Sequence, residues 1–232
     1  MTSDSNTQYA LISINPKWCE LIASGKKTIE VRKTRPKIET PFKCYIYCTH
    51  DNRKNALHLY VNSGYGRKEF GVTGNWRSGK DVVDVNPHLP AYRYNAYLAE
   101  GKVIGEFVCD NIIEYQYDYC DGVDIDDDNL LETQLEREDI NIYAKGKTIY
   151  GWHISDLVIY DEPKELSKFY IIDKKAVRQC SNRKQAYYSF TDTGYIKNGF
   201  YCEEKDDFCF DGYKRKVLIR PPKSWCYVKE LR

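Results

Sequence analysis

Residues 10–36 constrain the fold more than any other part of the chain, because their pattern fixes a strand, a helix and a second strand in succession. The apolar run ALISI predicts a strand, and Asn15 and Pro16 follow it as the N-cap and first residue of a helix. Gly25 is typical of the left-handed residue that ends a helix. The alternating, β-branched residues 27–33 then predict another strand. The chain therefore turns sharply at Gly25.

The strand after this turn carries charged side chains on one face. Glu30 and Arg32 share that face, whereas Ile29 and Val31 point to the core. Lys27 stands at the start of the strand, where its long side chain can curl toward Glu30. Two interpretations are open: a binding or catalytic site beside the helix end, or a surface ion pair worth about 0–1 kcal/mol.

The remaining pattern predicts a mainly β, α+β domain spanning residues 1–232. The 21 tyrosines favour half-buried strand faces. Two weakly patterned stretches, 52–95 and 171–212, are interpreted as insertions, the first with a hairpin near residues 60–70. A helix is expected over 130–144, and Glu162-Pro163 is expected to end a strand before a short helical turn. Further strands are expected at 42–48, 102–109, 112–119, 150–154, 157–160, 216–219 and 225–228.

The first segment resembles the ASCH domain, a member of the PUA-like superfamily. The family motif G-x-K-x-x-E-x-R is matched by Gly25, Lys27, Glu30 and Arg32. The later sequences GKVIGEFV, YGWHISDLVIYDEP and RPPKSWCYV also resemble the family, and the last two resemble its phage and prophage type. The helix before the motif is matched at Ile14, Pro16, Trp18 and Ile22.

This resemblance implies a PUA-like β-barrel with short flanking helices, which binds RNA or a nucleotide in a cleft beside the motif strand. Some similar proteins are amidohydrolases of acylated cytidines, and others are ribonucleases. In the hydrolases a Lys, a Thr three residues later and a Glu from a later strand act together. Lys27 matches the Lys, Glu30 stands in place of the Thr, and Glu106 is the match for the later Glu. The catalytic candidates are therefore Lys27, Glu30 and Glu106, with Lys27 and Glu106 as an acid–base pair.

Glu106 is also notable without the resemblance. It shares a strand face with Ile104 and Val108, and a carboxylate on an apolar face needs a partner. Burial there would raise its pKa. The alternative is a carboxylate that faces solvent at an edge strand. We expect Lys27, Glu30 and Glu106 to line one concave surface, with Arg32 at its edge.

The candidate ligand-binding residues combine cations with aromatic rings. Trp152 lies beside His153 and could stack on a base, although a histidine in a strand is often purely structural. Trp225 follows two cations in the same manner, although it could equally anchor a C-terminal strand. The full candidate set is Ser13, Arg32, Lys33, Trp152, His153, Lys223 and Trp225.

Charge is unevenly distributed along the chain, although the formal net charge is only +1. Residues 118–139 contain ten acidic residues and one Arg. Residues 164–232 contain 16 basic and 9 acidic residues, a net charge of +7. This distribution excludes a uniformly basic nucleic-acid-binding protein. It leaves a further alternative, an interaction protein whose acidic segment occupies a nucleic-acid-binding partner.

The nine cysteines do not predict a metal site, because no CxxC pair occurs. Cys44, Cys48 and His50, with the distant Cys202 and Cys209, are the nearest approach to one. We expect no metal and no cofactor, and we expect Cys44 and Cys48 to pack as small apolar residues. The chain shows no leader and no membrane-spanning run, which predicts a cytoplasmic protein with reduced thiols and no membrane partner. The oligomeric state is left open.

Overall fold

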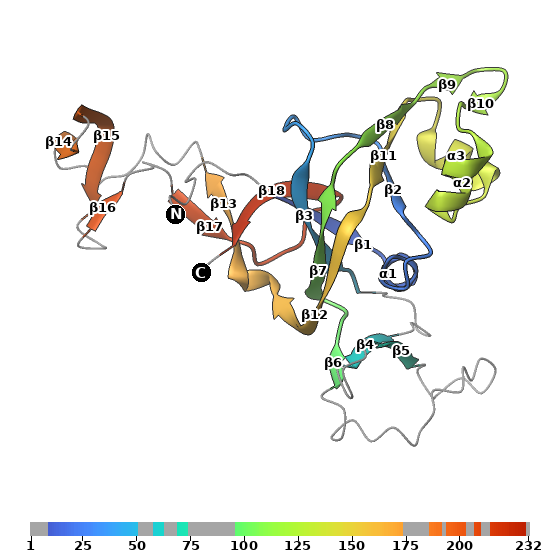
Figure 1. Ribbon diagram of the computed structural model, residues 1–232, viewed down its shortest axis with the longest axis horizontal. Helices are drawn as coiled ribbons and strands as arrows, with labels where there is room; N and C mark the ends of the chain where they lie inside the picture. Colours follow the sequence, from blue (N-terminus) through green and yellow to red (C-terminus); the bar gives the residue numbers. More distant parts are fainter. Residues whose placement is uncertain are drawn as a thin grey trace. The chain divides into compact units, whose positions relative to one another are not determined.

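The computed structural model describes residues 9–50, 58–62, 69–73, 96–173, 186–191, 194–202, 207–209 and 214–230 (Figure 1). The chain divides into two compact units. The first comprises Met1–Leu166 and Ile219–Tyr227, and the second comprises Ser167–Leu218 and Val228–Arg232. The second unit overlaps the second expected insertion. The description of residues 1–232 as a single domain stays a prediction.

The first unit is built around a mixed sheet in the order β12-β7-β3-β1-β18. Strands β1 and β3 are parallel, and β3–β7 and β7–β12 are antiparallel. A parallel pair needs a crossover connection, which α1 and the motif strand β2 supply between β1 and β3. The strands are β1 (Tyr9–Ile14), β3 (Phe42–Cys48), β7 (Lys102–Cys109), β12 (Ser155–Glu165) and β18 (Trp225–Glu230).

A second, antiparallel sheet in this unit has the order β2-β11-β8. One hydrophobic core joins the main sheet, α1 and Trp152 of β11. A separate core packs the other face of β2 against the acidic segment, which folds into a small hairpin and two helices. The elements are β2 (Ile29–Arg32), β8 (Ile112–Tyr115), β9 (Tyr117–Asp118), β10 (Gly122–Val123), α2 (Asp127–Thr133), α3 (Arg137–Ala144) and β11 (Ile149–His153).

The expected helix after β1 is confirmed as α1 (Pro16–Ala23). The Asn15 side chain caps it by accepting a hydrogen bond from the backbone N–H of Lys17 at 3.2 Å. Gly25 has a φ of +72°, which is the left-handed conformation expected for it. A Cβ atom at Gly25 would contact nothing within 4 Å, so glycine is needed there for its backbone conformation alone.

Two expected boundaries are wrong. The helix expected over 130–144 is divided into α2 and α3, because Gln134 is left-handed with a φ of 57°. Strand β12 does not end at Pro163. Its pairing with β7 shifts register between Ile159 and Lys164, so the proline, which lacks an N–H donor, lies where the ladder is interrupted.

The expected sheet-rich α+β fold is confirmed. In the described residues the strands form several separate sheets rather than one closed barrel. The expected hairpin in the first insertion is confirmed as β4 (His58–Asn62) paired with β5 (Glu69–Thr73), and β4 also pairs with β6 (Ala96–Leu98).

The second unit contains two small sheets. In one, β13 (Phe169–Asp173) pairs with β17 (Lys214–Val217) and with the end of β18. In the other, β15 (Gly194–Cys202) pairs with β14 (Ala186–Thr191) and β16 (Asp207–Cys209). The short helical turn η3 (Leu166–Lys168), expected after Pro163, is confirmed and leads from the first unit into β13. Among the described residues, no helix has the length and apolar character needed to span a membrane.

Candidate functional site

The motif residues Lys27, Glu30 and Arg32 form one buried charged cluster, which we call the motif cluster. Lys27 is only 2% exposed and Glu30 only 6% exposed. The Gly25 turn places Lys27 beside the first residues of β2, and pairing of β2 with β11 covers the strand. The sequence predicted that these three residues come together. It did not predict their burial, since we expected them to line an open surface.

Lys27 is fully engaged by the protein. Its Nζ donates to the backbone carbonyls of Ile29 at 2.8 Å and Thr133 at 2.6 Å, and it lies 3.5 Å from Glu30 Oε2. A lysine ammonium has three donors, so these partners use all of them. Burial lowers the pKa of Lys27, and the Glu30 carboxylate opposes that effect. Lys27 therefore ties β2 to the end of α2.

Arg32 connects the same cluster to the main sheet. Its Nη2 lies 2.9 Å from Glu30 Oε1 and donates to the backbone carbonyl of Ser13 at 2.6 Å. The Ser13 hydroxyl in turn donates to the carbonyl of Pro222, and the Ser13 N–H donates to the carbonyl of Ser224, each at 2.8 Å. The structure thus brings Ser13 and Arg32 together, as both were predicted to be site residues. The cluster of two cations and one carboxylate has a formal charge of +1.

Two N–H donors at this cluster are buried and have no hydrogen-bond partner in the described structure: Arg32 Nε and Trp152 Nε1. Trp152 is the strand partner of Glu30, so it lies on the same face as the motif cluster. Its ring is fully buried and makes edge contacts with Phe42 and Trp225, at centroid distances of 5.8 and 5.6 Å. The expected role of Trp152 as an exposed stacking surface does not fit this burial.

Residues 219–225, which we call the C-terminal strap, cross Ser13. The strap is held by the hydrogen bonds that Ser13 donates and by Trp225, whose Nε1 donates to Thr34 Oγ1 at 3.0 Å. Trp225 is half-buried, and Lys223 is exposed on the strap. Trp225 therefore lies against Trp152, and Lys223 lies on a segment that is held to Ser13.

Glu106 does not join the motif cluster, so the expected convergence with Lys27 is wrong. Its partner in β3 is Tyr45, while the neighbouring Cys44 and Ile46 face the core that contains Trp152. Alternate residues of a strand point to opposite faces, so Glu106 lies on the other side of the main sheet. The sequence shows that the side chains of β7 alternate between two faces, but it does not show which face lies toward the motif cluster.

Glu106 forms a separate group with Lys43 and Tyr160, which we call the Glu106 cluster. Its carboxylate lies 2.6 Å from Lys43 Nζ and accepts a hydrogen bond from the Tyr160 hydroxyl at 2.5 Å. Burial by itself would raise the pKa of Glu106, but the hydrogen bonds from Lys43 and Tyr160 outweigh it and lower the pKa. The direction expected from burial alone is thus wrong, because the sequence did not show these two partners.

Two other candidates also lie away from the motif cluster. The Lys33 ammonium sits 4.8 Å from the centre of the Tyr143 ring of α3. His153 Nδ1 lies 2.6 Å from Asp110 Oδ1, and this hydrogen bond lowers the pKa of Asp110. His153 follows Trp152 along β11 and therefore points to the opposite face of the strand. Lys33 lies just after the end of β2.

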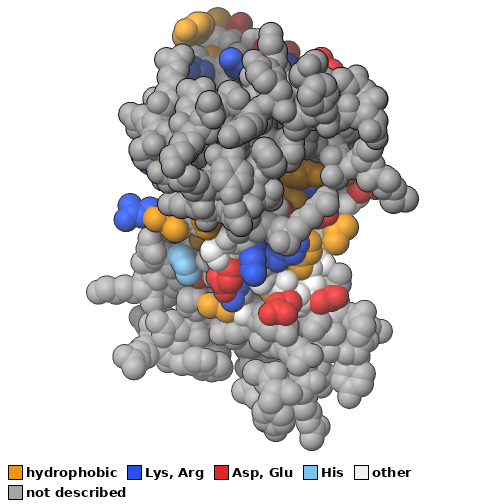
Figure 2. Space-filling view, turned by 90° about the vertical axis from the view of Figure 1, so that its left-hand side faces the viewer, with side chains coloured by type: hydrophobic (Ala, Val, Ile, Leu, Met, Phe, Trp, Pro, Cys, Tyr) orange, Lys and Arg blue, Asp and Glu red, His pale blue; other side chains and the backbone are white. Residues whose placement is uncertain are grey.

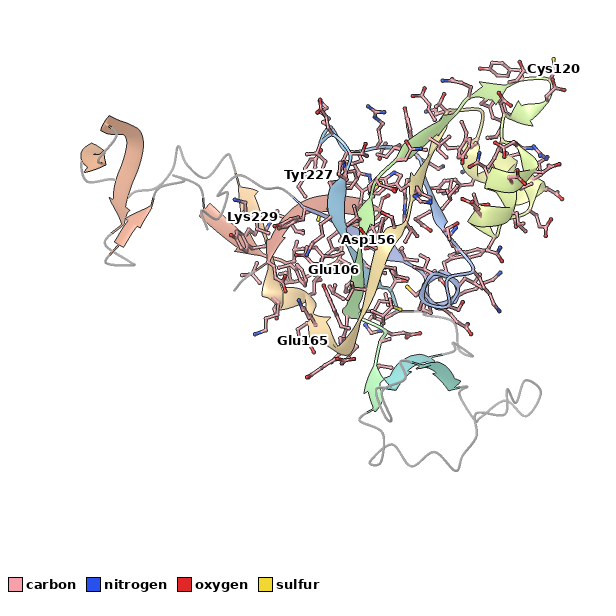
Figure 3. The ribbon with its side chains drawn as sticks, in the orientation of Figure 1. Glu106, Cys120, Asp156, Glu165, Tyr227 and Lys229 are labelled. Atoms are coloured by element: carbon pink, nitrogen blue, oxygen red, sulfur yellow. The ribbon has the colours of Figure 1, made fainter. Side chains whose placement is uncertain are left out.

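The acidic segment forms the surface of α2, α3 and the β9–β10 hairpin, whose tip carries Cys120 (Figure 3). Three large apolar side chains are exposed among its carboxylates: Tyr119, Leu131 and Ile142. On the face drawn in Figure 2, acidic and basic side chains lie beside one another across the described surface.

The described residues contain no group of three His, Cys, Asp or Glu side chains placed to hold a metal ion. Cys44 and Cys48 are buried in the main core, and burial raises the pKa of the Cys44 thiol. His50 is exposed and lies 3.8 Å from Glu100. The side chains of Cys202 and Cys209 lie outside the described residues.

Sequence reasoning missed Thr133 and Thr34, which hold Lys27 and Trp225. Thr133 contributes a backbone carbonyl 106 positions away from Lys27, and no side-chain motif marks such an acceptor. Pro222 and Ser224 of the C-terminal strap also contribute backbone carbonyls, which accept hydrogen bonds from Ser13.

Comparisons with known proteins give the following matches. The ASCH domain family model matches residues 12–214. Among solved structures, the chain is similar to a crystal structure of ASCH from Zymomonas mobilis, with 16% identity, a TM-score of 0.36, and 76% of this chain and 81% of that chain covered. A tyrosine-to-phenylalanine variant of that protein gives the same identity and TM-score, with 76% and 84% covered. The search of curated proteins gave no match.

Proposed function

Because the chain belongs to the ASCH domain family, a PUA-like family associated with RNA binding, we propose that it binds RNA or a nucleotide at the motif cluster. The observation that carries this proposal is the buried, net positive cluster with two unused N–H donors. Buried polar groups are nearly always paired, and a donor without a protein partner is a natural contact for a ligand. No other charged group in the described residues combines these properties.

Their contacts suggest a different role for each of the three motif residues. Lys27 acts as a positioning residue, because its donors already hold β2 and α2 together. Glu30 orients the Arg32 guanidinium from one side, and the Ser13 carbonyl orients it from another. Arg32 has the most exposed side chain of the three, at 11%, so it is the motif residue that we assign to the ligand contact.

The C-terminal strap supplies the contact with the phosphate backbone. Arg220 and Lys223 are both exposed on it, close in sequence to the carbonyls that bind Ser13. Exposed cations near a site attract phosphate and release counterions, which makes affinity depend on salt. Trp225 anchors the strap through Thr34.

Affinity for a single-stranded RNA oligomer, measured by fluorescence anisotropy over a series of salt concentrations, tests this proposal. Lys223→Ala is expected to weaken binding and to reduce the slope of log affinity against log salt by about one. The matched control is Lys147→Ala, which removes an exposed lysine next to the acidic segment and leaves the slope unchanged. The absence of measurable RNA or nucleotide binding would overturn the proposal.

A second candidate function is binding of a basic protein by the acidic segment. The observation that favours it is the exposure of Leu131 and Ile142 among carboxylates, because apolar anchors within a charged rim are typical of protein interfaces. Titration with a basic peptide that alternates lysine and leucine tests this function. Leu131→Ser with Ile142→Ser is expected to weaken binding at least about tenfold, and equal affinity for the double variant contradicts it.

A further inference from the structure

The C-terminal strap lies against two neighbours of the motif cluster, Ser13 and Trp152, but little of the strap is buried. Residues 219–224 belong to no helix or strand, and Ile219 is 82% exposed. Ser13 holds this segment with two hydrogen bonds, and the Trp225 indole adds a hydrogen bond to Thr34 at its end. Segments with irregular, exposed backbone are the ones that open locally while the rest of a protein stays folded.

Ser13 connects the strap to the motif cluster. Its carbonyl accepts a hydrogen bond from Arg32 Nη2 at 2.6 Å, while its hydroxyl and N–H donate to the strap carbonyls of Pro222 and Ser224. At the end of the strap, the ring of Trp225 packs against the ring of Trp152 with a centroid distance of 5.6 Å. Release of the strap would therefore uncover Ser13 and one side of the Trp152 ring.

The arrangement with the strap in place leaves two polar groups unsatisfied. Arg32 Nε and Trp152 Nε1 are buried and have no hydrogen-bond partner in the described structure. A buried donor without a partner is unfavourable, because it has lost its hydrogen bond to water and gained none in return. Opening the strap breaks the hydrogen bonds from Ser13, but admission of water to these donors offsets part of that loss.

We propose that the C-terminal strap is a lid, which closes the motif cluster in the free protein and leaves Ser13 when RNA or a nucleotide binds. This inference rests on the proposed function and concerns the regulation of the same site. Arg220 and Lys223 are exposed on the strap, so phosphate groups that contact them act on the lid itself. A lid that must open lowers the apparent affinity in proportion to the fraction of open molecules.

Weakening the contact between Ser13 and the strap tests the lid through the sign of its effect. Ser13→Ala removes the hydroxyl that donates to Pro222 and is expected to raise the affinity for a single-stranded RNA oligomer about three- to tenfold, because fewer molecules are closed. Thr34→Val removes the acceptor of the Trp225 indole and is expected to change the affinity in the same direction. A hydroxyl that contacts the ligand, or one with a structural role alone, gives weaker or equal binding when it is removed.

Ser155→Ala is the matched control. The Ser155 hydroxyl also donates to a backbone carbonyl, that of Val108, at 2.9 Å, and Ser155 is half-buried in β12. This variant loses the same kind of hydrogen bond away from the strap, so its RNA affinity is expected to equal that of the wild type. Thermal unfolding of the three variants shows that each is folded at the temperature of the binding measurement.

Amide hydrogen exchange of the wild-type protein tests the lid without any substitution. The Ser13 N–H donates to Ser224 of the strap at 2.8 Å, and the Ile154 N–H donates to Thr28 at the same distance without involving the strap. After correction for intrinsic rates, the Ser13 amide is expected to exchange at least about tenfold faster than the Ile154 amide. Equal protection of the two amides would overturn the inference.

The outcomes of the binding measurements separate the two proposals. If RNA binds to the wild type but Ser13→Ala and Thr34→Val bind it no more tightly, the lid is wrong and the proposed function stands. If the wild type and both variants bind neither RNA nor a nucleotide, both proposals are wrong.

Discussion

The motif cluster and the Glu106 cluster contain the same pair of charged residue types in different surroundings. In the motif cluster, Lys27 and Glu30 are nearly inaccessible to solvent, and their nitrogen–oxygen distance is 3.5 Å. In the Glu106 cluster the contact is shorter, 2.6 Å, but the side chains of Lys43 and Glu106 are 37% and 20% exposed. The shorter pair is not the more important one, because burial decides how much is lost when a partner is removed.

This comparison also separates two kinds of role. The buried cluster has charges that must be held by specific carbonyls, and it leaves two donors unused. In the Glu106 cluster, both carboxylate oxygens of Glu106 have partners, one from Lys43 and one from Tyr160. We infer that the first cluster is built for a ligand and that the second stabilises the outer face of the main sheet.

The largest expected difference follows from removing each carboxylate charge. Glu30→Gln leaves two buried cations without their counterion and is expected to lower the free energy of unfolding by about 3–5 kcal/mol. The matched variant Glu106→Gln is expected to lower it by only about 0–1 kcal/mol, because solvent screens the pair. Urea denaturation measures both, and equal losses would contradict the comparison.

A smaller loss of stability is expected from a change at the Gly25 turn, which positions the motif cluster but not the Glu106 cluster. Gly25→Ala is expected to destabilise the protein by about 1 kcal/mol, because alanine is strained at a φ of +72° while its methyl group meets no neighbour. Thermal unfolding measures this loss. An unchanged melting temperature would show that the turn tolerates a side chain and does not fix the position of Lys27.

The smallest expected effect is the pH dependence of the Glu106 cluster. The pKa of Glu106 is lowered in the folded protein, so its stabilising effect is present above its unfolded pKa of about 4.3 and is lost as the pH falls through the folded value. The difference in unfolding free energy between wild type and Glu106→Gln is therefore expected to shrink between about pH 6 and pH 3. If the difference in unfolding free energy instead grows as the pH falls, the pKa of Glu106 is raised rather than lowered in the folded protein.

Local features of the fold were predictable from the sequence because local rules govern them. The cap at Asn15, the turn at Gly25 and the strands β3 and β7 follow from residue type and spacing. The division of the 130–144 helix was missed because a non-glycine residue, Gln134, adopts the left-handed conformation there. The phage type and the cytoplasmic location stay predictions.

The candidate site was predictable only in part. The motif spacing brought Lys27, Glu30 and Arg32 together, since they follow one turn and one strand. Their burial depends on Thr133 at the end of α2 and on β11, which both lie far from the motif in sequence, Thr133 being 106 positions from Lys27. Glu106 was misplaced because alternation along β7 shows two faces without showing which of them meets β2.

The most direct test follows the indole N–H signals of the protein by proton–nitrogen NMR while a saturating RNA oligomer containing all four bases is added. Trp225→Phe identifies the Trp225 signal by its loss. The account predicts that this signal shifts on RNA addition, because Trp225 is half-buried and anchors the strap that carries the proposed phosphate contacts. An unmoved Trp225 signal in RNA-saturated protein would contradict the account.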